Sequence, residues 1–101
     1  MGRTARRQIR ELGLHYLSLS RPEAVNNLHA AVEAALAKID EPATRPRRFP
    51  AAYSGLASLD MLWIKQHSYW FGYVKGPNGV MTIANVVYQS ANIPARVEPF
   101  Q

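Results

Sequence analysis

The sequence predicts an α+β fold in which an N-terminal helical hairpin packs on a small antiparallel sheet of three strands. Apolar residues recur at helical spacing through residues 4–40. From residue 59 onward, apolar and aromatic residues alternate with a period of two, and short turn sequences interrupt them. Because short turns join the strands, successive strands are expected to be antiparallel neighbours, with the two helices on one face of the sheet.

The first helix is predicted over residues 4–19, where one side of the helix is apolar. That side carries Ala5, Ile9, Leu12, Tyr16 and Leu17. The same segment carries arginines three or four residues apart, which form a basic stripe: Arg3, Arg6, Arg7 and Arg10. Such a stripe is either a solvated helix face or a contact surface for phosphate or acidic side chains, and the sequence leaves both interpretations open.

The second helix is predicted from Pro22 to about Asp40, and Pro42 ends it. Ser20 followed by Glu23 matches a capping box, and a proline is compatible with the first helical turn. The apolar stripe of this helix consists of Val25, Leu28, Val32, Ala35, Leu36 and Ile39. Because the connection between the helices is short, they are predicted to form an antiparallel hairpin.

Residues 40–53 are predicted to be a loop, because three prolines exclude both helix and sheet there. Between these prolines lie Arg45, Arg47 and Arg48. A guanidinium group presents a planar fork of hydrogen-bond donors, so this loop is a candidate phosphate-binding segment. A solvated linker is the alternative interpretation.

Two strands are predicted over residues 55–75, separated by a turn at residues 67–68. In the first strand, Leu59, Met61 and Trp63 share one face, and Leu62 and Ile64 share the other. In the second strand, Tyr69, Phe71 and Tyr73 alternate with Trp70, Gly72 and Val74. Both strands are rich in aromatic and β-branched residues, which are typical of sheets.

A third strand is predicted over residues 80–89, after a turn at residues 76–79 that contains proline, asparagine and glycine. Strict alternation places Val80, Thr82, Ala84, Val86 and Tyr88 on one face, and Met81, Ile83, Asn85, Val87 and Gln89 on the other. Apolar side chains on both faces suit a central strand better than an edge strand. Prolines keep residues 95–101 from forming a long helix.

The bulk properties indicate one domain spanning residues 1–101, large enough to bury a core without metal or disulfide staples. The chain has no cysteine, which excludes disulfides, thiolate metal sites and a cysteine nucleophile. It also lacks a long apolar run and a signal-peptide pattern, so we expect a cytoplasmic protein without membrane association. The net charge of +5 and the pI of about 10.0 favour anionic partners such as nucleic acid, acidic protein segments or anionic lipid.

No pattern indicates a metal site or a cofactor, and we expect neither. The three histidines lie on different elements, and no glycine-rich phosphate-binding motif is present. A metal-independent nuclease site would need an acid or base near a ribose hydroxyl and cations around the phosphate. The candidates for it are Lys65, His67, Lys75 and Tyr88, with Arg96 nearby. Surface positions for the lysines and a packing role for the tyrosine are the simpler interpretation.

Across nearly its whole length, the chain resembles the RelE/ParE toxin superfamily. Residues 4–9 resemble the start of the family's first helix, and Pro22-Glu23-Ala24 with Leu28 resembles the start of the second. Residues 36–42 resemble the end of that helix, and a loop rich in proline and arginine follows. Residues 69–74 and 80–94 resemble the hallmark hairpin and last strand. Ala84-Asn85-Val86-Val87-Tyr88, followed by Asn92-Ile93-Pro94, stands where members often have Ile-Ala-Arg-Val-Leu-His and then Arg-Asp-Ile-Pro.

The resemblance implies a compact toxin that an antitoxin neutralises by wrapping an extended segment around it. RelE-like members cleave mRNA on the ribosome, whereas ParE-like members block DNA gyrase and have no nuclease site. In this chain, Asn85 stands where an arginine is common, Tyr88 where a histidine is common, and Ala57-Ser58 where an arginine is common. Fewer cations weaken transition-state stabilisation, so the ParE-like branch, without enzymatic activity, is favoured.

The ParE-like interpretation assigns the binding of gyrase or antitoxin to residues 96–101 and to the positive surface. That surface consists of Arg3, Arg6, Arg7, Arg10, Arg45, Arg47 and Arg48. One alternative is a ribosome-dependent mRNA endonuclease that uses the candidate residues named above. A second is a non-toxic basic domain that binds nucleic acid.

The family normally has a strand before its first helix, whereas only Met1, Gly2 and Arg3 precede the helix predicted here. Either the start is truncated, or the sheet has three strands and one exposed edge. Exposed strand edges invite pairing with another chain. We therefore expect the antitoxin to bind this edge and its neighbouring groove, by strand addition or by an apolar helix laid across the sheet.

Overall fold

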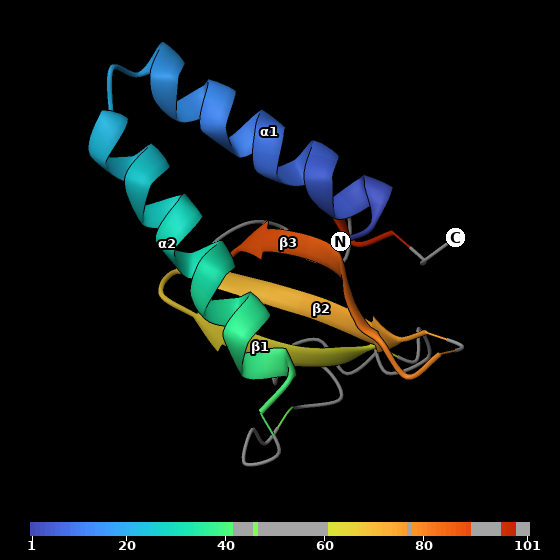
Figure 1. Ribbon diagram of the computed structural model, residues 1–101. Coiled ribbons are helices and arrows are strands. Elements are labelled where there is room, and N and C mark those ends of the chain that lie inside the picture. The colour runs from blue at the N-terminus through green and yellow to red at the C-terminus, as the bar shows by residue number, and fades with distance from the viewer. Residues whose placement is uncertain (42–45, 47–60, 77, 90–95, 99–101) are drawn as a thin grey trace.

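The computed structural model describes residues 1–41, 46, 61–76, 78–89 and 96–98. Two helices, α1 (Arg3–Ser18) and α2 (Pro22–Ile39), precede three strands, β1 (Leu62–Gln66), β2 (Tyr69–Lys75) and β3 (Met81–Tyr88) (Figure 1). The strands form one antiparallel sheet in the order β1-β2-β3. This arrangement confirms the predicted α+β class. Neither described helix has an apolar stretch long enough to cross a lipid bilayer.

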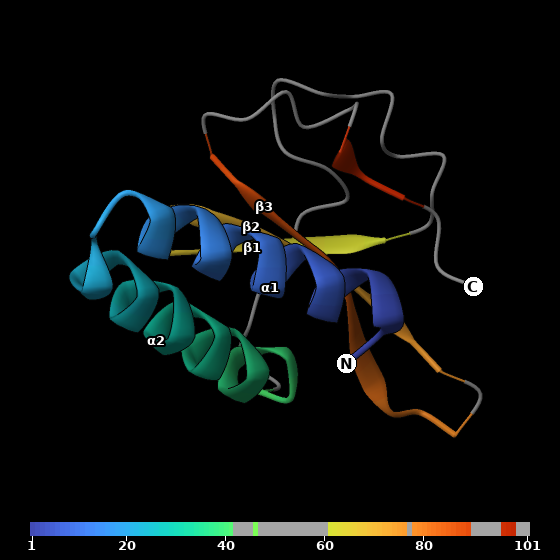
Figure 2. The same ribbon diagram turned by 90° about the horizontal axis from the view of Figure 1, so that it is seen from above.

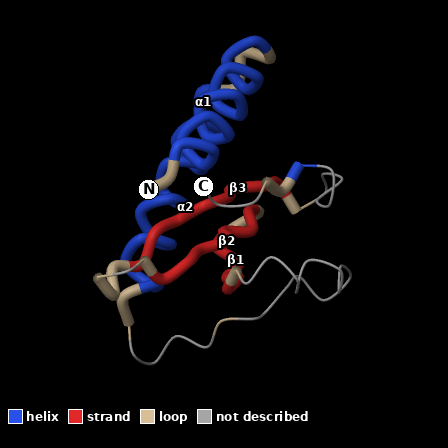
Figure 3. The backbone as a smooth tube through the Cα atoms, turned by 90° about the vertical axis from the view of Figure 1, so that its right-hand side faces the viewer, coloured by secondary structure: helices blue, strands red, loops and turns tan. Residues whose placement is uncertain are grey.

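Both helices pack on the same face of the sheet, as predicted (Figure 2). Helix α1 contacts β3, whereas α2 contacts β1 and β2. Viewed from the side, α1 lies beyond the β3 edge of the sheet (Figure 3). The core between these layers is built from alanines and one leucine of α2 and from apolar and aromatic strand residues, including Leu28, Phe71 and Ile83, which are fully buried.

Two leucines that were predicted for the apolar helix stripes are exposed instead. Leu17 is 57% exposed and Leu36 is 41% exposed, whereas their neighbours Tyr16 and Ala35 are buried. Consecutive residues of an α-helix project about 100° apart, because one turn takes 3.6 residues. Only one residue of each adjacent pair can therefore face the centre of the core, and the smaller or better hydrogen-bonded one does so here.

The turn between the helices differs from the predicted capping box. The N-cap of α2 is Arg21, and no side chain caps this helix end. Ser20 has a φ of 55°, so it lies in a left-handed turn one residue before the cap position. Glu23 interacts with Arg21 instead, at 3.3 Å between Oε1 and Nε. Pro22 occupies the first turn of α2 as predicted.

A β-bulge in β3 breaks the strict alternation that the sequence predicted. Tyr73 pairs with Ile83 and Gly72 pairs with Asn85, so Ala84 has no residue opposite it in β2. As a result, Ile83 and Val86 both belong to the helix-facing core. Ala84 and Val87 belong to a second cluster on the opposite face, with Met61 and Trp63. The predicted faces of β3 are therefore correct only on one side of the bulge, because the extra residue exchanges the faces.

Strand β3 lies at the edge of the sheet, not at its centre as its two apolar faces had suggested. Five consecutive residues of β3, Ile83 to Val87, are nevertheless buried. The helix-facing core covers one face of the strand, and the second cluster, which includes Val97, covers the other. Burial on both faces therefore comes from layers above and below the sheet and not from a strand on each side.

Substitution of Gly72 by alanine is expected to lower the free energy of unfolding by about 1–3 kcal/mol, because it overpacks the second cluster. A Cβ atom at this position would lie 2.8 Å from Cη2 of Trp63, whose side chain is fully buried. Gly13→Ala is the matched control, because a Cβ there would meet nothing within 4 Å. That control should stabilise α1 by up to about 1 kcal/mol. Equal denaturation midpoints for the two variants would contradict this packing account.

Candidate functional site

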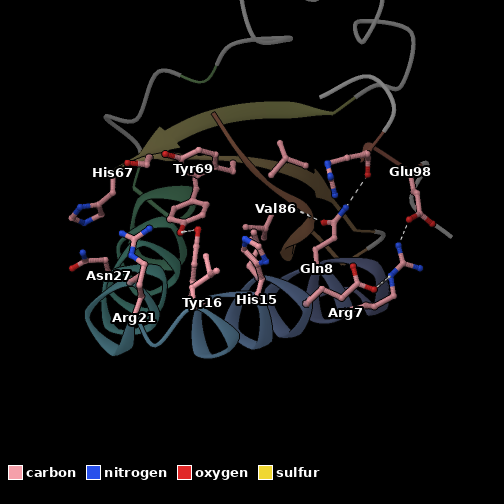
Figure 4. Close-up of a pocket in the computed structure, with 18 residues that line it drawn as sticks. Arg7, Gln8, His15, Tyr16, Arg21, Asn27, His67, Tyr69, Val86 and Glu98 are labelled. Atoms are coloured by element: carbon pink, nitrogen blue, oxygen red, sulfur yellow. Dashed lines mark hydrogen bonds and ion pairs between the residues drawn. The ribbon is translucent and has the colours of Figure 1, made fainter. Parts of the chain in front are cut away.

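An open groove of about 980 Å³ lies between α1 and the outer edge of β3 (Figure 4). Its walls are formed by α1, the start of α2, the turn at residues 67–68 and the end of β3. Arg96 and Glu98 close one end of the groove. Side chains from five distant parts of the chain therefore meet here, and the open side leaves room for a segment of another molecule.

Gln8 joins α1 to the edge of β3 at the end of the groove where residues 96–98 lie. Its Oε1 accepts a hydrogen bond from the backbone N–H of Val86 at 2.6 Å. Its Nε2 donates to Oδ1 of Asn85 and to the carbonyl oxygen of Arg96, each at 3.0 Å. Inside a sheet the outward N–H of a strand pairs with the next strand, but β3 is an edge strand and has no such partner among the described strands. The Gln8 amide takes the place of that partner, so β3 is closed here without another strand.

Asn85 fixes the C-terminal segment against β3. Its Nδ2 donates to the carbonyl oxygen of Glu98 at 2.8 Å, and its Oδ1 accepts from the Glu98 N–H at 3.0 Å. The side chain is fully buried, and Nδ2 also lies 3.4 Å from Sδ of Met61. Arg7 adds an ion pair with the Glu98 carboxylate. The Asn85 amide thus makes structural hydrogen bonds, and a buried polar group needs such partners.

Tyrosines line the opposite end of the groove. The hydroxyl groups of Tyr16 and Tyr69 are hydrogen-bonded at 2.5 Å, and both side chains are buried. Tyr88 packs edge-on against Tyr69, with ring centroids 5.7 Å apart. The guanidinium of Arg21 lies 5.9 Å from the centroid of the Tyr16 ring, which is a cation–π distance. Figure 4 shows Arg21, Asn27 and His67 gathered at this open end.

Burial is the main reason why the pKa of Tyr69 lies well above its ordinary value, and the Tyr16 hydrogen bond raises it further. Burial also raises the pKa of Tyr73. Each of these phenols therefore stays protonated at neutral pH, when it can donate a hydrogen bond. Tyr69 is not poised to act as a phenolate base.

Stability is expected to fall as the pH rises above about 10, the ordinary tyrosine pKa. Above that pH the unfolded chain releases the Tyr69 proton while the folded chain keeps it, so ionisation favours unfolding. One such group lowers the free energy of unfolding by about 1.4 kcal/mol per pH unit until its folded pKa is reached. Denaturant unfolding of the wild type and of Tyr69→Phe between pH 9 and 11 measures this, and the variant should decline less steeply. Parallel pH profiles would contradict the assignment to Tyr69.

The outer edge of β3 is closed at its start and open at its end. The N–H of Gly2 donates to the carbonyl oxygen of Ile83 at 2.8 Å, and the Gln8 side chain accepts a hydrogen bond from the N–H of Val86. The N–H of Gln89 donates to the carbonyl oxygen of Ser68 at 2.9 Å, so the backbone groups of Gln89 point toward β2. By alternation the N–H and C=O of Tyr88 point outward, toward the groove. The described residues provide no hydrogen-bond partner for this N–H, so a short stretch of edge is available for pairing.

The structure brings together only two of the four candidate catalytic residues. His67 and Tyr88 both line the groove, whereas Lys65 and Lys75 do not. Lys65 pairs with Trp70 and Lys75 pairs with Met81, so the lysines lie toward opposite ends of β2. Five residues of strand separate these ends by about 17 Å. The predicted nuclease set is therefore dispersed, and both lysines are exposed.

The candidate binding arginines fall into three groups. Arg3, Arg6 and Arg10 are exposed on the first half of α1. Arg7 is paired with acidic side chains, and Arg96 lines the groove. The remaining predictions lie outside the described residues: Arg45, Arg47 and Arg48, together with the loop around them, Leu59 and residues 99–101.

Sequence reasoning missed the polar residues that build the groove, above all Gln8 and the pair Tyr16–Tyr69. A signal for Gln8 was present, because this polar residue stands at helical spacing from Ala5 and Leu12, inside the apolar stripe. Tyr16 and Tyr69 are separated by 53 positions along the chain, and no local pattern links them. Within the described ranges, no group of three histidine, aspartate or glutamate side chains is arranged to hold a metal ion.

Comparison of the chain with protein-family models, with characterised proteins and with solved structures finds no match.

Proposed function

We propose that this chain is the toxin of a type II toxin–antitoxin system, of the ParE-like kind that binds and inhibits DNA gyrase and is neutralised by a cognate antitoxin. The observation that carries the proposal is the groove beside the open end of the β3 edge. It offers a partner chain both backbone hydrogen bonds and a lining of apolar and aromatic side chains. These are the two features that strand addition uses for affinity and specificity.

The occupant proposed for the groove is an extended segment of the antitoxin that pairs with the backbone of Tyr88. Leu12 and Leu19 line the groove beside this edge and would take alternate apolar side chains of the added strand. Arg21 and Arg96, both exposed at the groove, favour acidic residues on the flanks of that segment. The proposed antitoxin segment is therefore extended, with alternating apolar residues between acidic ones.

Two observations support action by binding over action by catalysis. Asn85 stands where a cation is common in the mRNA-cleaving members of the family that the chain resembles, and its amide is engaged by the Glu98 backbone and the Gln8 side chain. The lysines Lys65 and Lys75 lie far apart on the sheet, where they cannot surround one phosphate. A toxin that acts by binding needs neither a cation at position 85 nor lysines gathered around a phosphate. Gyrase is the target that the ParE-like interpretation supplies.

One observation favours the alternative of a ribosome-dependent mRNA endonuclease. His67 and Tyr88 lie in the same groove, where an imidazole and a phenol could share acid–base work on a ribose hydroxyl. The Tyr88→Phe variant distinguishes the two functions, because it removes only the hydroxyl. Toxicity should be unchanged if the protein acts by binding. Loss of toxicity with retained folding would support the endonuclease instead.

Expression of the chain alone in bacterial cells tests the toxin assignment. Growth arrest that co-expression of the antitoxin relieves is the expected result. Normal growth at a high level of folded protein would contradict both toxin functions and would favour a non-toxic basic domain. Circular dichroism of the purified protein separates that outcome from simple misfolding.

A further inference from the structure

Charge is unevenly distributed over the two helices. The first turn of α1 has no acidic residue, and three exposed arginines, Arg3, Arg6 and Arg10, occupy its first half. The described acidic residues lie elsewhere: Glu23, Glu33, Asp40 and Glu41 on or next to α2, and Glu11 and Glu98 beside Arg7. Among the described residues, no ion pair compensates the charges of Arg3, Arg6 and Arg10, and we call the surface that these three side chains form the arginine face.

The three arginines of the arginine face differ from their neighbour Arg7 in ion pairing. Arg7 lies 3.6 Å from Glu11 and forms an ion pair with Glu98. Over the part of the chain that the structure describes, no ion pair involves Arg3, Arg6 or Arg10. Their guanidinium groups repel one another across a shallow cleft that all three line together with Met1, Thr4 and the ion-paired Arg7. A bound polyanion would relieve this repulsion.

The spacing of the three arginines suits a repeating array of negative charges. Positions 3 and 10 are two turns apart on nearly the same side of the helix, and position 6 lies between them. The span from residue 3 to residue 10 is about 10 Å, since each residue adds about 1.5 Å. Phosphates of one duplex strand follow each other every 3.4 Å or so along the axis, so the face covers about three steps.

The composition of this surface favours nucleic acid over an acidic protein. Stable protein interfaces have an apolar centre with aromatic or aliphatic anchors. Here the apolar residues of the same helix end turn inward: Ala5 is buried, and Met1 and Ile9 pack against the core. What remains outside is almost purely guanidinium, whose fork of donors matches phosphate oxygens. We propose that the arginine face binds the phosphodiester backbone of nucleic acid, without sequence specificity and independently of the groove.

Fluorescence anisotropy with the full-length protein and two labelled probes tests this proposal. The probes are a duplex DNA of about 20 base pairs and a single-stranded RNA of the same length. The variant Arg3→Gln/Arg6→Gln/Arg10→Gln should lower the slope of log affinity against log salt by about 2.1 for the single-stranded RNA and by about 2.7 for the duplex. Between about 50 and about 200 mM salt the wild type should therefore lose roughly 40-fold more affinity for the duplex than the variant. Each slope difference is divided by about 0.9 for the duplex or about 0.7 for the single strand, and the probe with the larger quotient identifies the nucleic acid.

The matched control is Lys38→Gln/Lys65→Gln/Lys75→Gln, which removes the same amount of positive charge from other surfaces. It should keep the wild-type salt slope within about one unit. An equal decrease of the salt slope in both triple variants would overturn the proposal, because it would show that the nucleic acid is attracted by net charge alone. Absence of wild-type binding to either probe, or equally tight binding to polyglutamate, would also overturn it. Circular dichroism and thermal unfolding check that each variant is folded.

Discussion

Substitution of Asn85 by leucine is expected to lower the free energy of unfolding by roughly 2–5 kcal/mol. Leucine has a similar volume but no polar atoms, so the N–H and C=O of Glu98 lose the partners that hold them at 3.0 and 2.8 Å. Each backbone group left without a partner in a buried position is worth about 1–3 kcal/mol. Gln8 would keep its bond to Arg96 but lose Asn85 as an acceptor. Urea denaturation measures the change directly.

Asn26→Leu is the control for this prediction, because Asn26 is exposed on α2 and the exchange of side chains is the same. Its effect should stay within about 0.5 kcal/mol. If Asn85→Leu were as stable as this control, the amide would not be holding residues 96–98 against β3. The structural interpretation of Asn85, and with it one argument against a catalytic site, would then fail.

Substitution of Tyr88 by proline is expected to weaken antitoxin binding by roughly 30-fold to 1000-fold while leaving the sheet intact. Proline removes the N–H that points into the groove and places ring atoms where an added strand would approach. The lost bond and the unpaired carbonyl of the partner together amount to about 2–4 kcal/mol, and 1.4 kcal/mol is a factor of ten. The bonds between β2 and β3 do not use this N–H, and proline is tolerated at such edge positions.

Tyr88→Val is the matched control, because it removes the phenol ring but keeps the backbone donor. Isothermal titration calorimetry with the antitoxin should show a much smaller loss for valine than for proline. Equal losses of affinity in the two variants would mean that the antitoxin recognises the Tyr88 ring, for example with a helix laid in the groove. The proposal of strand addition at this edge would then be wrong. Thermal unfolding of both variants checks that the sheet is retained.

The parts of the fold that sequence predicted are those in which local periodicity decides the outcome. Both helices and β2 form where their patterns predict, because each of these elements turns one apolar face toward the core. The turn at residues 67–68 falls between two clear strand patterns. The bulge at Ala84 was not predictable in this way. It depends on how Gly72 and Tyr73 pair with β3, which is a contact between strands and not a local preference.

The candidate site was less accessible to sequence reasoning than the fold. At the groove, the buried amide of Gln8 bonds to the backbone of Arg96, 88 positions away along the chain, and the buried amide of Asn85 bonds to the backbone of Glu98. Hydrogen bonds of this kind leave no periodic trace. Asn85 was noticed only as a missing cation, whereas its actual contribution is the structural one. His67 and Tyr88 were among the predicted candidates, and both line the groove.

The supercoiling activity of purified DNA gyrase, with the purified protein titrated in, tests the central functional proposal most directly. The account predicts inhibition at near-stoichiometric ratios, reversal by the antitoxin, and the same inhibition by Tyr88→Phe, because no acid–base step is involved. Full supercoiling in the presence of excess folded protein would contradict the gyrase proposal. Mapping of mRNA cleavage on ribosomes would then test the endonuclease for which His67 and Tyr88, both in the groove, are the candidate residues.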